Sequence, residues 1–229
     1  MNRRLIIIEM VLIFCTFFLT GYLAQGQSPT ARFSDFSSVA LSYLIAGIPQ
    51  VLLMVFIITV YSGSPPSEFG LGSLSAHDII RTLLSYLGVF AVLIPLGAVL
   101  FLLPDRARSI LSGGYRWGLR SASQLPLALA LSLLAGYREE LFFRSYLITR
   151  MEQLGSPAVL SVAVTSLLFC LGHLYEGLAG LIVTAVLGAY LAIVFIKVRN
   201  LHVVAVAHGL YNFTIFCISL LAYPLLGAQ

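Results

Sequence analysis

Apolar segments long enough to cross a lipid bilayer dominate this sequence of 229 residues. About seven of them approach the roughly 20 residues that a helix needs to span about 30 Å of hydrocarbon. They cover residues 5–23, 39–61, 80–103, 125–149, 157–174, 178–198 and 203–221. Because backbone polar groups must be satisfied within the lipid, each segment is expected to be helical. The sequence therefore predicts an all-α, polytopic transmembrane helical bundle of about seven spans.

The composition also indicates a membrane protein, since 59% of the residues are hydrophobic and only 10% are charged. A soluble domain is typically about 25% charged. The formal net charge of +4 comes from basic residues that are scattered or lie at segment ends, which favours lipid headgroups as partners and argues against nucleic acid. Cys15, Cys170 and Cys217 all lie in apolar runs, which indicates buried thiols rather than disulfides or a metal site.

Short connections rich in Gly, Ser and Pro separate the segments, so we predict a single integral membrane domain over residues 1–229. The first segment follows Arg3 and Arg4. We interpret it as an uncleaved helix rather than a signal peptide, because no clear small-residue cleavage site follows it. Basic and aromatic residues within 105–120 indicate a short stretch on the membrane surface. Basic residues are balanced between the two sides, so the orientation of this expected multi-pass protein of the cell membrane stays open.

Charged residues inside the fourth segment give the first indication of function. An acidic or basic residue at the bilayer centre costs about 2.5–3.5 kcal/mol, so Glu139, Glu140 and Arg144 need partners or water. On a helix, Glu140 and Arg144 share one face, where the guanidinium can neutralise and orient the carboxylate. Glu139 points about 100° away. We interpret Glu139 as the reactive group and Glu140 with Arg144 as structural; a charged helix end at the membrane surface is the alternative.

Imidazole and amide groups occur in two later segments. His173 ends the fifth segment, and Phe169, one turn earlier, is expected to orient it; a lone histidine in an apolar helix is more often a buried core residue than a catalyst. His208 and Asn212 lie four residues apart in the last segment. They could hold a carbonyl oxygen that becomes an oxyanion, or they could form an interhelical hydrogen-bonding pair. Together with Glu139, these groups predict a polar catalytic cavity within the bundle.

Other polar residues receive no catalytic role. His77 and His202 lie near segment ends beside charged or polar neighbours and are expected to be solvated. Glu9 lies inside the first apolar segment, and the sequence offers no explanation for it.

The three polar motifs resemble those of the CPBP family, the CAAX protease and bacteriocin-processing family that is also called Abi. The motifs are Glu-Glu-x-x-x-Arg at 139–144, Phe-x-x-x-His at 169–173 and His-x-x-x-Asn at 208–212. The resemblance covers residues 121–221, which we interpret as a protease core, and Glu-Phe-Gly-Leu at 68–71 is also similar to the family. That family includes the type II CAAX prenyl endopeptidases and immunity proteins.

The resemblance implies an intramembrane endopeptidase with a polar cavity open to one membrane face. By this resemblance, Glu139 and His173 activate a water molecule, and His208 with Asn212 stabilises the oxyanion. The implied partners are a peptide or membrane-anchored protein substrate and membrane lipid.

The role of a metal stays open at this point. The sequence lacks the His-Glu-x-x-His motif of many zinc proteases, which favours a glutamate-dependent mechanism with no cofactor. Family names nevertheless often include the word metalloprotease, and Glu139, His173 and His208 could form a His-His-Glu zinc site.

Two functions other than proteolysis also fit these residues. Some members of the family look like immunity or scaffold proteins, which would bind a peptide or a partner without hydrolysing it. Intramembrane Glu, Arg and His also occur in transporters and proton relays, but the sequence shows no repeated halves that would favour this function.

Overall fold

The computed structural model describes residues 3–19, 35–103 and 119–226, and it describes side chains as far as residue 221. Every regular element in these ranges is a helix, which confirms the all-α prediction. The first half contains α1 (Arg3–Phe14), the π-helix η1 (Cys15–Leu19), α3 (Phe36–Phe56), the π-helix η4 (Ile57–Tyr61), the 3₁₀ helix η5 (Pro66–Phe69) and α4 (Ala76–Phe101). The second half contains η6 (Ala122–Gln124), α6 (Leu125–Glu140), the π-helix η7 (Leu141–Tyr146), α7 (Leu147–Gln153), α8 (Ala158–Leu171), η8 (Leu174–Glu176), α9 (Gly177–Val198) and α10 (Leu201–Leu226).

Each predicted apolar segment coincides with a helix, and the transmembrane helical bundle is confirmed. Four of the described helices are both long and apolar enough to cross a membrane, namely Phe36–Tyr61, Ala76–Phe101, Leu174–Val198 and Leu201–Leu221. Helix α8 is apolar but only 14 residues long, and the run from α6 to α7 carries several charges. Residues 105–118 of the predicted surface stretch lie outside the described residues. The single-domain boundaries, the core at 121–221 and the orientation stay predictions.

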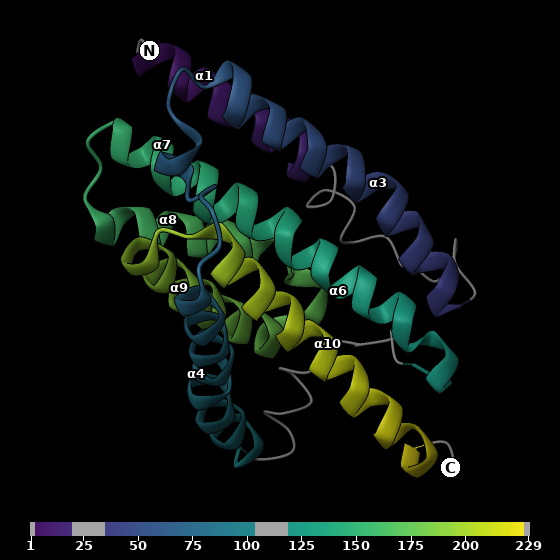
Figure 1. Cartoon of the computed structure of the whole chain (residues 1–229). Helices are drawn as coiled ribbons and strands as arrows, with labels where there is room; N and C mark the ends of the chain where they lie inside the picture. Colours follow the sequence, from purple (N-terminus) through teal and green to yellow (C-terminus); the bar gives the residue numbers. More distant parts are fainter. Residues whose placement is uncertain (1–2, 20–34, 104–118, 227–229) are drawn as a thin grey trace.

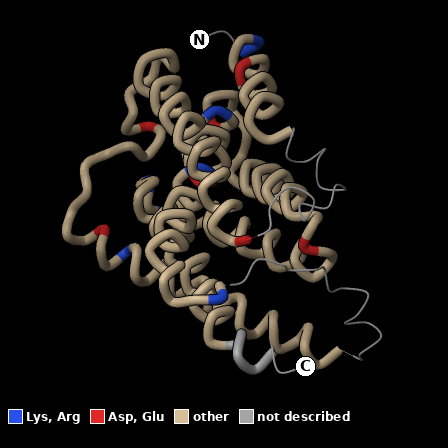
Figure 2. Tube along the Cα trace, turned by 90° about the vertical axis from the view of Figure 1, so that its right-hand side faces the viewer, with Lys and Arg blue, Asp and Glu red and all other residues tan. Residues whose placement is uncertain are grey.

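Three helices run alongside one another through the length of the protein, while a fourth diverges from them (Figure 1). Helices α3, α6 and α10 form the parallel set, and α4 extends away at a steep angle. Figure 2 shows that some charged positions lie inside the bundle rather than at its ends. Part of the charged residues of this membrane protein therefore lies in its interior.

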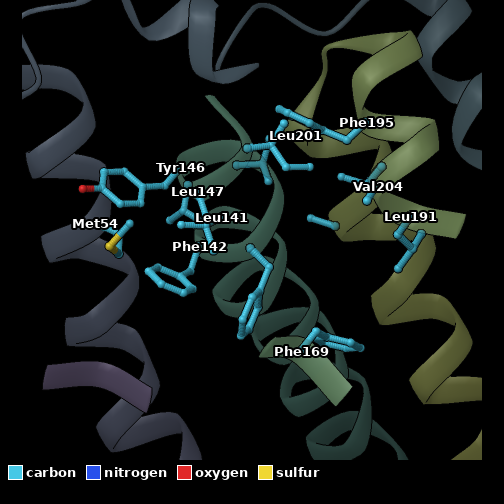
Figure 3. Close-up of a cluster of buried hydrophobic side chains, with 14 of the residues drawn as sticks. Met54, Leu141, Phe142, Tyr146, Leu147, Phe169, Leu191, Phe195, Leu201 and Val204 are labelled. Carbon is cyan, nitrogen blue, oxygen red and sulfur yellow. The ribbon is translucent and has the colours of Figure 1, made fainter. Parts of the chain in front are cut away.

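The hydrophobic core surrounds η7, in which every residue is buried. Phe142 and Tyr146 of η7 face Met54 of α3, and Leu191 and Phe195 of α9 lie on the opposite side (Figure 3). A helix that is buried on all sides lies at the centre of its bundle. The segment directly after the paired glutamates is therefore the structural centre of the protein.

Two glycines bring α6 and α10 into backbone contact. A Cβ atom at Gly136 would lie 2.4 Å from the carbonyl oxygen of Ala205 and 2.8 Å from the backbone nitrogen of Gly209. Small residues allow this close approach of helices in membranes. Gly136 precedes Glu140 by one turn and Gly209 follows His208 directly, so the close approach carries these two polar side chains toward each other.

The loop before α4 docks against the same centre. Phe69 is fully buried, and its carbonyl oxygen accepts a 2.5 Å hydrogen bond from Ser145 Oγ. Gly70 adopts a positive φ of 73°, and its carbonyl oxygen accepts a bond from the backbone nitrogen of Leu201. A Cβ atom at Gly70 would lie 2.9 Å from the ring of Phe195, so both the dihedral angle and the space require glycine. The Glu-Phe-Gly-Leu segment therefore joins η7 to the start of α10.

A buried ion pair explains Glu9, which the sequence left without a partner. Glu9 Oε1 lies 2.8 Å from Arg150 Nη2 and accepts a 2.6 Å hydrogen bond from the hydroxyl of Tyr146. The guanidinium of Arg150 also lies 5.3 Å from the ring centroid of Phe69. A charge within an apolar segment is tolerated when it meets an opposite charge, and this pair fastens α1 to α7.

We predict that Gly136→Ala will destabilise the protein, because the added methyl group meets backbone atoms of α10 that cannot move aside. Overpacking of this kind costs about 1–3 kcal/mol. The matched control is Gly97→Ala in α4, where no atom lies within 4 Å of the added Cβ. Thermal unfolding in detergent, followed by circular dichroism, should give a lower Tm for Gly136→Ala only. Equal Tm values for the two variants would show that the close approach does not support the fold.

Candidate active site

The paired glutamates stand where α6 changes into a π-helix. Glu140 is the last residue of α6 and η7 begins at Leu141. The wider helix is closed by a bond from the backbone nitrogen of Leu147 to the carbonyl oxygen of Phe142, five residues earlier. π-Helical turns inside α-helices occur frequently at functional sites. The two carboxylates leave this junction in different directions, and each enters a separate environment.

Glu140 enters a fully buried cluster of charged groups. Its Oε1 atom lies 2.9 Å from Arg144 Nη1 and 2.8 Å from His208 Nδ1, and the Glu140 and Arg144 side chains are both 0% exposed. Arg144 also donates to the carbonyl oxygen of Gly188 at 3.1 Å, and its guanidinium lies 4.5 Å from the ring centroid of Phe169. The structure thus brings the predicted Glu140–Arg144 pair together and adds His208 to it.

Glu139 faces a cavity of about 210 Å³ instead. Its side chain is 16% exposed, and its Oε1 atom accepts a long, 3.5 Å hydrogen bond from the hydroxyl of Tyr43. Its Oε2 atom lies 3.9 Å from His208 Nε2. The cavity is lined by Phe17, Phe18, Tyr43, Arg138, Glu139, Phe143, Phe169, Gly172, His173 and Tyr175. Glu139 and His173 therefore share one cavity with largely aromatic walls.

His173 lies two residues beyond the end of α8 rather than on the helix itself. Its Nδ1 atom is 2.9 Å from the carbonyl oxygen of Phe169, and the two rings lie 4.8 Å apart. A carbonyl oxygen only accepts hydrogen bonds, so Nδ1 carries a proton and Nε2 of the neutral ring is an acceptor. Phe169 thus fixes the position of His173 through both its backbone and its ring.

The last helix supplies His208 and Asn212, but they differ in their surroundings. His208 is 2% exposed, and its ring lies edge-on to Phe169 at 5.9 Å. Asn212 is half-buried, and it does not line the cavity that contains Glu139. Its side-chain amide forms no hydrogen bond with another residue in the part of the chain that the structure describes. The structure therefore brings Glu139, His173 and His208 into one region and leaves Asn212 one turn away from it.

Sequence reasoning missed the residues of the first half of the chain that line the cavity or hold Arg138 beside it. Tyr43 and Gln50 of α3 both contact Arg138, which lies beside Glu139 in the sequence. Tyr43 and Gln50 are seven residues apart, which places them on one face of a helix. This spacing could have predicted from the sequence that the second segment presents a polar face to the bundle. His202 was expected to be solvated, but it is half-buried and lies 2.9 Å from the hydroxyl of Tyr137. His77 is exposed.

The zinc site that the sequence left open needs three ligands around one point. Among residues 3–19, 35–103 and 119–226, no group of three or more His, Cys, Asp or Glu side chains is placed to hold a metal ion. The Nδ1 atoms of His173 and His208 contact Phe169 and Glu140, which leaves Nε2 of each ring as the atom that could bind a ligand. The mechanism without a metal stays a prediction.

Comparison with known proteins concerns the second half of the chain. Residues 121–214 match the family of type II CAAX prenyl endopeptidase Rce1-like proteins. No curated protein and no solved structure matches the chain. The matched region runs from η6 into α10 and contains all three polar motifs, but it excludes α1 and α3. The match confirms the resemblance that the motifs predicted in this region of the chain.

Proposed function

We propose that this protein is an intramembrane endopeptidase that hydrolyses a peptide bond of a membrane-associated protein or peptide. The observation that carries this proposal is the shared cavity of Glu139 and His173. A carboxylate and an imidazole with a free acceptor nitrogen are the groups that general-base activation of water requires. The family match, which is to endopeptidases, covers both residues.

In the proposed reaction, one water molecule binds between Glu139 and His173. The water donates one hydrogen bond to Nε2 of His173 and the other to the carboxylate of Glu139. Its oxygen attacks the scissile carbonyl carbon as Glu139 takes the proton, and the carbonyl electron pair moves onto the oxygen. When the C–N bond breaks, the proton on Glu139 passes to the leaving amine. Glu139 then ends in its starting state.

His208 and Asn212 are the proposed donors to the oxyanion, as the family resemblance implies. His208 already gives its Nδ1 proton to Glu140, so it can donate from Nε2 only as an imidazolium. That charge would be balanced, because Glu139 and Glu140 are two negative groups beside Arg144 and His208. Asn212 must turn its amide toward the substrate to take part. A donor held in place at the oxyanion contributes about 2.7–4 kcal/mol to transition-state stabilisation.

The cavity walls fit an apolar peptide segment better than a polar one. Six of the ten lining residues are Phe or Tyr. Extended peptide must enter, because a scissile bond within a helix has its carbonyl oxygen engaged. A peptide or the anchor of a membrane protein is the proposed substrate class, and the cell membrane is the proposed location.

We predict that Glu139→Gln will abolish cleavage while the protein still folds and inserts. Loss of the general base should lower the rate by about 10²–10⁴-fold. Mass spectrometry of membrane and secreted peptides should find an uncleaved substrate that accumulates in cells with this variant. Cells with Glu152→Gln, which alters a partly exposed glutamate paired with Arg199, should resemble the wild type. Identical peptides in all three cell lines would indicate an immunity or scaffold protein that binds without hydrolysis.

We predict that Glu140→Gln will act mainly on stability, because it leaves the buried guanidinium of Arg144 without a counter-charge. Breaking a buried ion pair in this way costs about 3–5 kcal/mol. Glu152→Gln again serves as the control, since loss of an exposed pair costs about 0–1 kcal/mol. Yield and Tm in detergent should fall for Glu140→Gln only. A stable Glu140→Gln protein that has lost activity would indicate that Glu140 is the reactive residue and Glu139 the structural one.

We predict that cleavage does not depend on a metal. Treatment of the purified protein with 1,10-phenanthroline should leave the cleavage rate unchanged, and elemental analysis should find less than one zinc ion per chain. The physical reason is the proposed use of Glu139 as the base for water, a task that zinc would otherwise share. Inhibition that added zinc reverses would establish the zinc-dependent form of the protease.

A further inference from the structure

A chain of polar contacts leads from α3 to the proposed catalytic carboxylate. Gln50 Oε1 accepts a 2.5 Å hydrogen bond from Arg138 Nε, and the hydroxyl of Tyr43 accepts a 2.9 Å bond from Arg138 Nη1. The same hydroxyl donates to Glu139 Oε1 at 3.5 Å. Arg138 also donates to the carbonyl oxygen of Phe17 at 3.3 Å. Residues from η1, α3 and α6 thus meet beside the cavity.

The direction of these bonds follows from the chemistry of the groups. A guanidinium can only donate, so the oxygen of Tyr43 must accept from Arg138. The hydroxyl proton is then directed away from Arg138 and toward Glu139. The guanidinium also lies 5.1 Å from the ring centroid of Tyr43, which holds the ring in place. Among the described residues, no ion pair joins Arg138 to a carboxylate; Arg138 acts on Glu139 through its electrostatic field and, by hydrogen bonds, through the hydroxyl of Tyr43.

We propose that Tyr43 is a positioning residue for Glu139, and that Arg138 and Gln50 hold Tyr43 in the required orientation. This proposal rests on the proposed function, in which Glu139 is the general base. Tyr43 occupies Oε1 and leaves Oε2, the oxygen nearest to His208, to accept the proton of the water. A base that is held in one orientation reacts faster, because it loses less conformational entropy on reaching the transition state.

If Tyr43 had only a structural role, its hydroxyl would serve to hold α3 against α6. Arg138 already achieves this through Gln50, and it reaches η1 through Phe17. The contact between Tyr43 and Glu139 adds little to such a fastening, because it is long and lies at the edge of a cavity. The two roles therefore predict different results when only the hydroxyl is removed.

The variant that separates these roles is Tyr43→Phe, because it keeps the ring and its stacking on Arg138. The matched control is Tyr86→Phe, which removes the hydroxyl bond between Tyr86 and Thr214 that links α4 to α10. Both proteins are placed in nanodiscs of phosphatidylcholine and phosphatidylglycerol. Cleavage is measured on a pool of fluorescence-quenched peptides with apolar, membrane-spanning sequences.

We expect Tyr43→Phe to lower kcat by about 10- to 100-fold, the usual effect of a misplaced catalytic group. KM should stay within about twofold of the wild-type value, because the aromatic ring that lines the cavity is kept. Tyr86→Phe should keep the wild-type kcat. If Tyr43→Phe keeps the wild-type kcat, or loses only stability, the positioning role is overturned.

A second measurement needs no substrate. Infrared difference spectra between each protein and its Glu139→Gln derivative isolate the carboxyl bands of Glu139. We expect these bands to shift in Tyr43→Phe and not in Tyr86→Phe; unchanged bands would overturn the proposed contact. A wild-type protein that cleaves no peptide would overturn the proposed function, and with it the role of Tyr43 in the reaction. The infrared result separates that outcome from an error about Tyr43 alone.

Discussion

The buried contact of Glu140 with Arg144 and His208 is the constraint on which the rest of the site depends. Removal of three such groups from water costs several kcal/mol for each ion, and the cost is offset only when the geometry satisfies them together. The close approach of α6 and α10 at Gly136 makes this geometry available. Once Glu140 is fixed in the core, its neighbour Glu139 must leave the helix in a different direction. The aromatic cavity lies in that direction.

Adjacent glutamates can therefore have different tasks, because the protein gives them different partners. Glu140 has no exposed surface and contacts two groups that carry or can carry positive charge. Glu139 is partly exposed, contacts a neutral hydroxyl and shares its cavity with His173. Glu140 is enclosed by its charged partners without access to the cavity, whereas Glu139 faces the space in which water and substrate can bind. The proposed division of labour within the pair rests on this difference.

Much of this arrangement follows from local patterns in the sequence. Hydropathy predicted where the helices lie, and a spacing of four residues predicted that Glu140 and Arg144 would pair. Contacts between distant segments had no such signal. Glu9 and Arg150 are 141 residues apart in the sequence, and Tyr43 and Glu139 are 96 residues apart. Such pairs form only after the helices pack, so the sequence could show that Glu9 needs a partner but could not identify it. The π-helix after Glu140 was also missed, because hydropathy does not distinguish it from an α-helix.

The origin of the cavity walls bears on how relatives of this protein could differ. The polar groups of the proposed reaction all lie within residues 121–214, the region that matches the endopeptidase family. Phe17, Phe18 and Tyr43 line the same cavity but come from η1 and α3, outside that region. Arg138 connects the matched region to η1 and α3, since it lies beside Glu139 in the sequence and is held by residues of both elements. A change in the first half of the chain can therefore reshape the space for substrate without altering the residues that activate water. Because Arg138 also holds Tyr43, such a change would reach the chemistry through the orientation of Glu139.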